Sequence, residues 1–243
     1  MIKKRDFYHQ RIKYSFNWNL QNHKNKLDGS SNNREEFRRL GSYFKKIYQT
    51  SLVPNDIFNS KNIQRISQFK IRGLKNGFLG SFSKQLIREE KIIKFGKDFK
   101  LCKFAQGVYD NYKKNQINKN PGHDPILKNI LIKDKDSVAI EVPIWSNING
   151  KYITGHIDLI QIDLDQNLVK VIDYKPEGKF MVSLPQVATY GLLLKKRLGI
   201  NLLQCISFNK NEAWKYDPDI LKTEIKEYLI SQGINTRIWE FYC

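Results

Sequence analysis

The chain contains little cysteine and no cysteine pair. Its three cysteines, Cys102, Cys205 and Cys243, stand far apart among 243 residues, without a CxxC spacing. Three scattered thiols argue against a disulfide framework, and a four-cysteine iron–sulfur cluster would need one more ligand. We therefore expect reduced thiols, a reducing compartment and no iron–sulfur cluster.

Other features are missing as well. No apolar run approaches the length of a membrane span, and the N-terminal segment MIKKRDFYHQ lacks the apolar stretch of a signal peptide. These absences predict a cytoplasmic protein without a membrane partner, nucleoid-associated in a prokaryote, while the basic N-terminus leaves organellar import open. No GxxxxGK[ST] loop occurs, so we expect no ATPase motor within the chain. Nothing suggests the Ser/His/Asp or zinc constellation of a small-molecule hydrolase.

Positive charge is abundant and unevenly distributed. Residues 1–100 hold 23 Lys+Arg and 8 Asp+Glu, a net charge of +15. Residues 101–243 hold 19 Lys+Arg and 16 Asp+Glu, a net charge of +3, so the whole chain carries +18. A concentrated positive charge attracts the phosphate backbone of nucleic acids, largely independently of sequence. DNA is therefore the expected partner.

Residues 1–100 are predicted to form a basic helical region that binds DNA. The segment REEFRRLGSYFKKIYQ has apolar residues at helical spacing, and its basic side chains crowd one predicted helix. Aromatic residues are interleaved through the region and are suited to stacking on unpaired bases. The alternative is that the charges only keep the protein soluble. The candidate DNA-binding residues are Arg34, Arg38, Arg39, Lys45 and Lys46.

Residues 101–243 are predicted to form an α/β domain. A helix is expected over residues 99–114, then strands over 136–145, 151–162 and 167–175. A second helix over 183–200, a fourth strand over 201–209 and a C-terminal helix over 217–233 complete the order. The core order is α-β-β-β-α-β, which gives a central mixed sheet flanked by helices.

The three central strands carry an unusual set of charged residues. Asp158 stands in the middle of the apolar segment GHIDLIQI, where a lone charge is seldom buried without a reason. Asp173 and Lys175, in IDYK, share one face of their strand because side chains alternate. If the two strands pair as a hairpin, Asp158 lies close to Asp173. Carboxylates suit Mg²⁺, and a lysine beside them can orient a nucleophile or stabilise a charged transition state.

Three further residues accompany this set. Gln186 and Tyr190, in QVATY, are four residues apart and therefore share one helix face. His156 points the same way as Asp158, so it either packs within the sheet or touches DNA or a metal. Glu141 opens the strand EVPIW. This combination predicts a metal-dependent phosphodiester-cleaving site.

The motifs GHID, IDYK and QVATY, over about residues 100–210, resemble the RecB-like nuclease family of the PD-(D/E)xK superfamily. The resemblance implies a restriction-endonuclease-like core, with Asp158, Asp173 and the Tyr174 carbonyl as ligands of Mg²⁺ or Mn²⁺. It implies that Lys175 is the catalytic lysine and that Gln186 and Tyr190 support the site and contact DNA. Glu141 matches a glutamate that often precedes the GxxD strand.

One family feature is altered. Relatives commonly carry GxxxH on the helix before the sheet, whereas Gly107 is followed here by Asn111 at the histidine position. Asp110 and His123 are the other candidates for the missing metal ligand.

The expected activity is that of a deoxyribonuclease, more specifically an exonuclease that prefers single-stranded or frayed DNA. It would act in repair, recombination or the processing of mobile elements in defence. Any helicase or recombination partner would be a separate chain. A structure- or sequence-selective endonuclease, or a catalytically weak DNA-binding subunit, is the alternative.

Overall fold

The computed structural model describes residues 1–28, 35–50, 52–235 and 237–242. In this part of the chain, nine strands form one mixed sheet in the order β1-β2-β5-β6-β7-β8-β9-β4, and β3 pairs with β6 beside β7. The strands are β1 (Ile2–His9), β2 (Ile12–Asn19), β3 (Gln64–Arg65), β4 (Ile92–Phe95), β5 (Ser137–Ile148), β6 (Lys151–Asp163), β7 (Leu168–Tyr174), β8 (Leu203–Phe208) and β9 (Ala213–Tyr216). The pairs β7–β8 and β3–β6 are parallel and the others are antiparallel.

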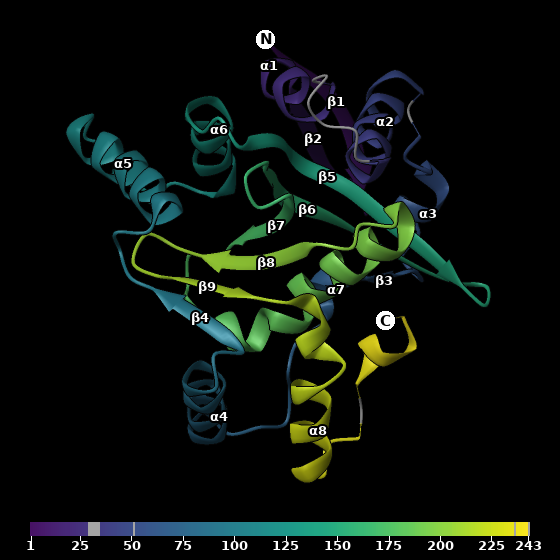
Figure 1. Ribbon diagram of the computed structural model, residues 1–243, viewed down its shortest axis with the longest axis vertical. Coiled ribbons are helices and arrows are strands. Elements are labelled where there is room, and N and C mark those ends of the chain that lie inside the picture. The colour runs from purple at the N-terminus through teal and green to yellow at the C-terminus, as the bar shows by residue number, and fades with distance from the viewer. Residues whose placement is uncertain (29–34, 51, 236, 243) are drawn as a thin grey trace.

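Helices flank the sheet (Figure 1). The α-helices are α1 (Leu20–His23), α2 (Glu35–Thr50), α3 (Asn55–Asn59), α4 (Asn76–Arg88), α5 (Lys100–Lys114), α6 (His123–Lys133), α7 (Phe180–Leu198) and α8 (Glu224–Ser231). Shorter helical turns are Lys24–Asp28, Ile66–Gln68, Pro218–Leu221 and Ile238–Phe241. The α/β class predicted from the sequence is confirmed.

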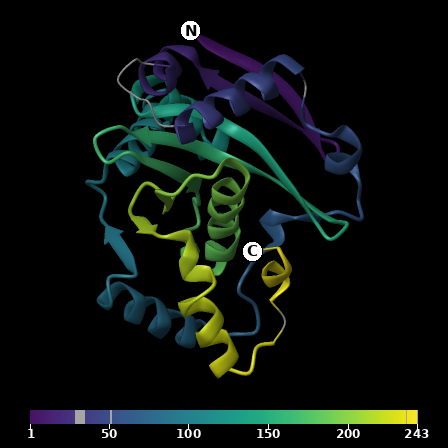
Figure 2. The same cartoon turned by 45° about the vertical axis from the view of Figure 1, so that its right-hand side comes forward.

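Two apolar cores hold the layers together. The larger core joins α2 and α7 to the sheet, and Figure 2 shows α7, in green, next to the sheet. The smaller core joins α5 and α6 to the sheet, through residues such as Leu127, Ile172 and Tyr174. The alternation expected for β7 is confirmed, because Val169 and Val171 belong to the larger core and Ile172 and Tyr174 to the smaller one.

The N-terminal region differs from the prediction. Strands β1 and β2 form an antiparallel hairpin that joins β5, and β4 lies at the opposite edge of the same sheet. The expectation of a wholly helical region over residues 1–100 is therefore wrong for these segments, and the sheet extends across the boundary expected at residue 100. The reason is the alternation in β2, where Phe16 and Trp18 are buried within an otherwise basic segment.

The predicted elements from residue 100 onward are present, and helix α6 and strand β9 are found in addition. Helix α6 (His123–Lys133) lies between the helix expected over residues 99–114 and the strand expected from residue 136, where no element was predicted. Its signals are Pro125 in the first turn and apolar residues at helical spacing, Ile126, Leu127, Ile130 and Leu131. His123 is the first residue of this helix, which precedes β5.

Helix α7 ends where the sequence suggested. Gly199 follows it in the left-handed conformation, with φ +59°, which costs glycine little. A Cβ at this position would also lie 2.8 Å from the Arg39 guanidinium, which covers the end of the helix. In the described part of the chain, no helix combines the length and apolar character required to cross a membrane.

Candidate active site

The predicted acidic residues meet where β6 and β7 separate. The antiparallel pairing of these strands runs from Asp163 to Leu159 in β6, and Leu159 pairs with Ile172. The next two residues in this register are Asp158 and Asp173. The Oδ2 atom of Asp158 accepts a hydrogen bond from the Tyr174 backbone N–H at 2.9 Å. Both aspartates are buried, so the gap between the strands forms an enclosed acidic site.

A hydrogen-bonded network ties Asp173 to α7. The Nζ atom of Lys175 lies 2.6 Å from Asp173 Oδ2 and donates to Gln186 Oε1 at 3.1 Å. The Gln186 amide in turn donates to Asp173 Oδ1 at 3.4 Å and to the Tyr190 hydroxyl at 3.3 Å. The structure therefore brings together all four of these residues, from β7, the segment after it and α7.

Tyr190 reaches the sheet because residue 155 has no side chain. A Cβ on Gly155 would lie 2.6 Å from Tyr190 Cε1 and 3.0 Å from Ile66 Cδ1. Such distances are closer than van der Waals contact. The glycine of the GHID motif thus allows α7 to pack directly against β6.

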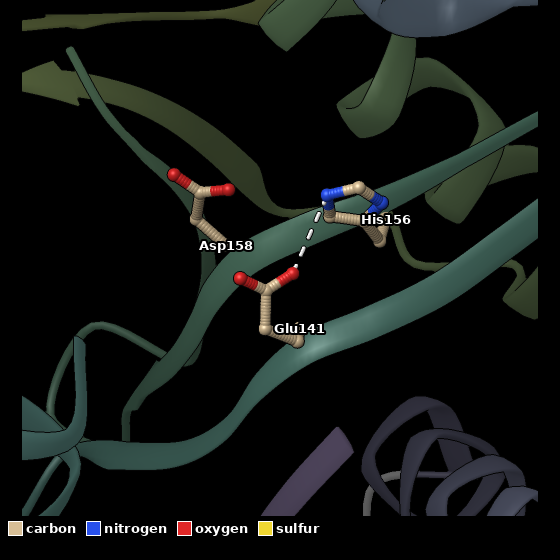
Figure 3. Close-up of side chains that lie close together, drawn as sticks. All are labelled: Glu141, His156 and Asp158. Atoms are coloured by element: carbon tan, nitrogen blue, oxygen red, sulfur yellow. Dashed lines mark ion pairs between the residues drawn. The ribbon is translucent and has the colours of Figure 1, made fainter. Parts of the chain in front are cut away.

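Glu141, His156 and Asp158 form a second group of potential ligands. One ligand atom from each residue lies within 4.8 Å of the others (Figure 3). His156 Nε2 is 3.4 Å from Glu141 Oε2. Glu141 has φ +52°, a left-handed conformation that is uncommon and strained for a residue with a side chain. This backbone turn occurs within β5, at the residue that bears the carboxylate.

His156 is packed by the N-terminal hairpin. Its ring lies 4.0 Å from that of Tyr14, centroid to centroid, with His9 and Phe7 further out. Burial, followed by the charges of neighbouring groups, holds the pKa of His156 well below its usual value. The ring is therefore neutral near pH 7, the form that can bind a metal. Of the two expectations for His156, packing within the fold is met, and contact with DNA or a metal stays a prediction.

The acids carry unusual proton affinities. Burial, then the neighbouring Asp158 and Asp173, raises the pKa of Glu141 to about 9. Burial, then Asp173, raises the pKa of Asp158 to about 7. Burial opposes the charge of Lys175, but Asp173 and Asp158 outweigh it and raise the pKa of this lysine. Three carboxylates thus face one ammonium group, an imbalance that a divalent cation would offset.

The three candidates for the altered histidine position lie in different surroundings. Asn111 is exposed on α5 and accepts a hydrogen bond from Asn115, and Asp110 is exposed and bonded to Gln106. Tyr109, whose hydroxyl contacts that of Tyr174, is about 200° away from Asn111 around the helix. His123 instead lies 3.8 Å from Asp158, between its Nε2 and the Oδ2 atom. The expected role of Asn111 as a ligand gains no support, because its side chain points away.

The basic residues of α2 lie at the other end of α7. The Arg39 guanidinium donates to the carbonyls of Leu198 and Gly199, and it pairs with Glu35. Twelve helical residues separate Leu198 from Gln186, or about 18 Å. Lys45 pairs with the half-exposed Asp28.

Of the other residues expected to bind DNA, Arg38 and Lys46 line a hollow beside α2, and Arg34 lies outside the described residues.

The site opens to the surface through a cleft of about 350 Å³. Lys175 and Gln186 form part of its wall, His123 stands at one side, and Lys70 and Lys179 lie at its rim. Glu177 also lines the cleft and pairs with Lys179, so Lys70 and Lys175 are the cations that a phosphate group entering it would meet.

Tyr109 is a residue that the sequence did not single out. Its hydroxyl lies 3.1 Å from that of Tyr174, the residue between Asp173 and Lys175. The family motif GxxxH starts at Gly107 and therefore pointed to Asn111, four residues later. The apolar face of α5 instead includes Val108 and the partly buried Tyr109.

Comparison with known proteins adds little. No family model matches the chain, and no curated protein matches it. A solved structure titled "Crystal structure of SSO0001" is similar, with a TM-score of 0.33 and 14% identity. The similarity covers 85% of this chain and 94% of that one. A likeness this weak supports no inference about fold family or function, which therefore depend on the site itself.

Proposed function

We propose that this protein is a metal-dependent deoxyribonuclease of the RecB-like PD-(D/E)xK type, which hydrolyses phosphodiester bonds of DNA. The observation that carries the proposal is the meeting of Asp158, Asp173 and Lys175 at the point where β6 and β7 separate. A buried pair of acids beside an ammonium group, open to a cleft with basic residues, is suited to a phosphate diester.

The element order supports the finer fold assignment. Helices α5 and α6, strands β5, β6 and β7, helix α7 and strand β8 follow one another in the order expected of a restriction-endonuclease-like core. The predicted site residues lie on the elements where the sequence motifs placed them: Asp158 on β6, Asp173 and Lys175 at the end of β7, and Gln186 and Tyr190 on α7. We include this core type in the proposal.

The donor set fits a divalent cation. Glu141 Oε2 is buried and, within the described residues, has no hydrogen-bond partner. Asp158 belongs both to the group with Glu141 and His156 and to the neighbourhood of Asp173. Carboxylate oxygens suit Mg²⁺ and Mn²⁺, and the two adjacent imidazoles suit Mn²⁺ better than a purely oxygen site would. When bound, such an ion would activate water and neutralise charge on the phosphate.

The remaining residues have separate roles in the proposal. Asp158, Asp173 and Glu141 would hold the ion, and the Tyr174 carbonyl would be available as a further oxygen ligand. Lys175 is positioned by Asp173 and Gln186, so that its ammonium group orients the attacking water or stabilises charge on the phosphate. Tyr190 fixes the other end of the Gln186 amide. The exonuclease activity on single-stranded or frayed DNA remains the preferred form of this proposal, with endonucleolytic cutting as its alternative.

The test uses end-labelled single-stranded, duplex and circular DNA with Mg²⁺ or Mn²⁺. We expect cleavage by the wild type and its loss in Asp158→Asn and Asp173→Asn, with DNA binding retained. Asp163→Asn is the matched control, because Asp163 lies in the same strand as Asp158 but at its far end, where it contacts Lys170 and the Gln166 backbone N–H. Circular DNA separates internal from end-dependent cutting. Cleavage by Asp173→Asn at the wild-type rate would refute the proposed catalytic site. If the wild type and all variants bind DNA but none cleaves it, the alternative of a DNA-binding subunit is favoured.

A further inference from the structure

A second hollow lies beside the candidate active site, on the side of α5. It has a volume of about 500 Å³ and is enclosed by α5, residues 116–121 and Lys210. Volumes in this range accommodate small organic molecules, so a nucleotide is of suitable size. The mouth of the active-site cleft reaches His123, two residues after Pro121 at the edge of this hollow.

Direct contacts connect the hollow to the catalytic residues. Tyr109 lines the hollow and bonds through its hydroxyl to Tyr174, whose backbone N–H holds Asp158. The ring of Tyr174 also packs edge-on against His123, at 5.2 Å between centroids. Tyr174 therefore connects the hollow, through its side chain, with the acidic site, through its backbone.

The hollow is basic. Lys113, Lys119 and Lys210 line it, and none of them forms an ion pair within the described part of the chain. Its acidic member, Asp110, is hydrogen-bonded to Gln106. Unpaired lysines at the rim of a concave surface create a positive potential that favours a phosphate backbone.

Aromatic side chains accompany these lysines. Tyr112 lines the hollow and is partly exposed, so part of its ring is available to a base or sugar. Tyr109 has Lys210 Nζ 4.3 Å from its ring centre, which fixes the position of that ammonium group. Alternating positive and aromatic side chains are typical of surfaces that bind single-stranded nucleic acid.

We propose that this hollow binds the DNA strand immediately beside the scissile phosphate, with Lys113, Lys119 and Lys210 on phosphates and Tyr112 on a base. The inference rests on the proposed nuclease function and names its strand path. It differs from the sequence-based expectation, which placed the path on α2, about 18 Å along α7 from Gln186.

The test compares two variants that lose the same charge. One carries Lys113→Ala, Lys119→Ala and Lys210→Ala. The control carries Lys75→Ala, Lys84→Ala and Arg88→Ala, three exposed residues on or next to α4. Binding of a labelled single-stranded oligonucleotide is measured by fluorescence anisotropy at several salt concentrations, with EDTA present so that binding is independent of cleavage.

We expect the hollow variant to bind roughly tenfold or more weakly at low salt. Its plot of log affinity against log salt should flatten by about 2, because each phosphate contact with a single strand contributes roughly 0.7 to the slope. The control should stay close to wild type. An equal loss in both variants, or no loss in the hollow variant, would overturn the proposed path.

Photocrosslinking locates the strand independently. An oligonucleotide containing 5-iodouracil should crosslink to the peptide that contains Tyr112, and crosslinks confined to α2 would overturn the path. Cleavage assays on the same proteins separate the two proposals. If the wild type cleaves DNA and the hollow variant binds and cleaves equally well, only the proposed strand path is refuted. If the hollow variant loses binding but the wild type does not cleave, only the proposed nuclease function is refuted.

Discussion

The carboxylate of Asp158 accepts a hydrogen bond from the backbone N–H of Tyr174 across the gap between β6 and β7, at 2.9 Å. This bond takes the place of further strand pairing beyond Leu159 and Ile172. It fixes one oxygen of Asp158 while the residues on either side of Tyr174, Asp173 and Lys175, form the neighbouring ion pair. The sheet itself thus sets the spacing of the proposed catalytic groups.

Gln186→Leu should slow cleavage roughly 10–100-fold while leaving metal binding nearly unchanged. The amide connects Lys175, Asp173 and Tyr190, so its removal frees the lysine to adopt other positions. Single-turnover rates at saturating Mn²⁺, together with a Mn²⁺ titration, measure the two effects separately. A purely structural role would lower the melting temperature without this slower chemical step in the folded protein.

Several features of the site were accessible from sequence because they are local. The periodicity of β6, β7 and α7 is strong, and side-chain alternation places Asp173 and Lys175 on one face. The hairpin of β6 and β7 follows from a short turn, which brings Asp158 to Asp173. The C-terminus of α7 is marked by Gly199. Short-range rules therefore predicted most of the arrangement around Asp173.

The remaining features depend on long-range packing. Strand β2 pairs with β5 over 120 residues away in sequence, and the burial of Phe16 and Trp18 outweighs the basic residues around them. No element was predicted between residue 114 and β5. Helix α6 begins there at His123, and the contact of His123 with Asp158 follows.

The stability gained from metal should increase with pH. Glu141 and Asp158 have pKa values of about 9 and about 7 in the folded protein, raised chiefly by burial. Their stabilising contribution is complete below their ordinary pKa values, near 4, and is lost as the pH rises through 7 and 9. A cation would replace the protons, so Mn²⁺ should raise the melting temperature more at pH 9 than at pH 6.

Glu141→Gln is the control for that experiment. The variant keeps the shape of the side chain but cannot ionise, so the melting temperature of the metal-free protein should fall less steeply between pH 6 and pH 9. Its response to Mn²⁺ should also be smaller. Identical pH profiles for wild type and variant would contradict the assignment of Glu141 to the cation site.

Gly155→Ala should destabilise the protein and impair cleavage. The added methyl group would lie 2.6 Å from Tyr190 Cε1, so α7 would have to shift away from β6. Overpacking of this kind costs about 1–3 kcal/mol, which corresponds to a fall of roughly 2–12 °C in melting temperature.

The matched substitution is Gly107→Ala, on α5, where no atom lies within 4 Å of the added Cβ. Alanine favours a helix by about 0.5–1 kcal/mol relative to glycine, so this variant should melt slightly higher than wild type. Differential scanning calorimetry of the two variants measures both changes. Equal stability of Gly155→Ala and wild type would mean that the sheet and α7 accommodate the methyl group, and that the glycine is not needed for the position of Tyr190.

His123→Ala should weaken Mn²⁺ binding roughly 10–100-fold, whereas Asn111→Ala should leave it unchanged. His123 Nε2 lies 3.8 Å from Asp158 Oδ2, close enough for a small movement to bring the imidazole to a cation held by that carboxylate. Asn111 is exposed and bonded to Asn115 on the opposite side of α5. Isothermal titration with Mn²⁺ compares the two variants directly, and Asn111→His is the sharper probe. A gain in Mn²⁺ affinity from Asn111→His, with no loss from His123→Ala, would restore the sequence-based assignment and place α5 differently against the site.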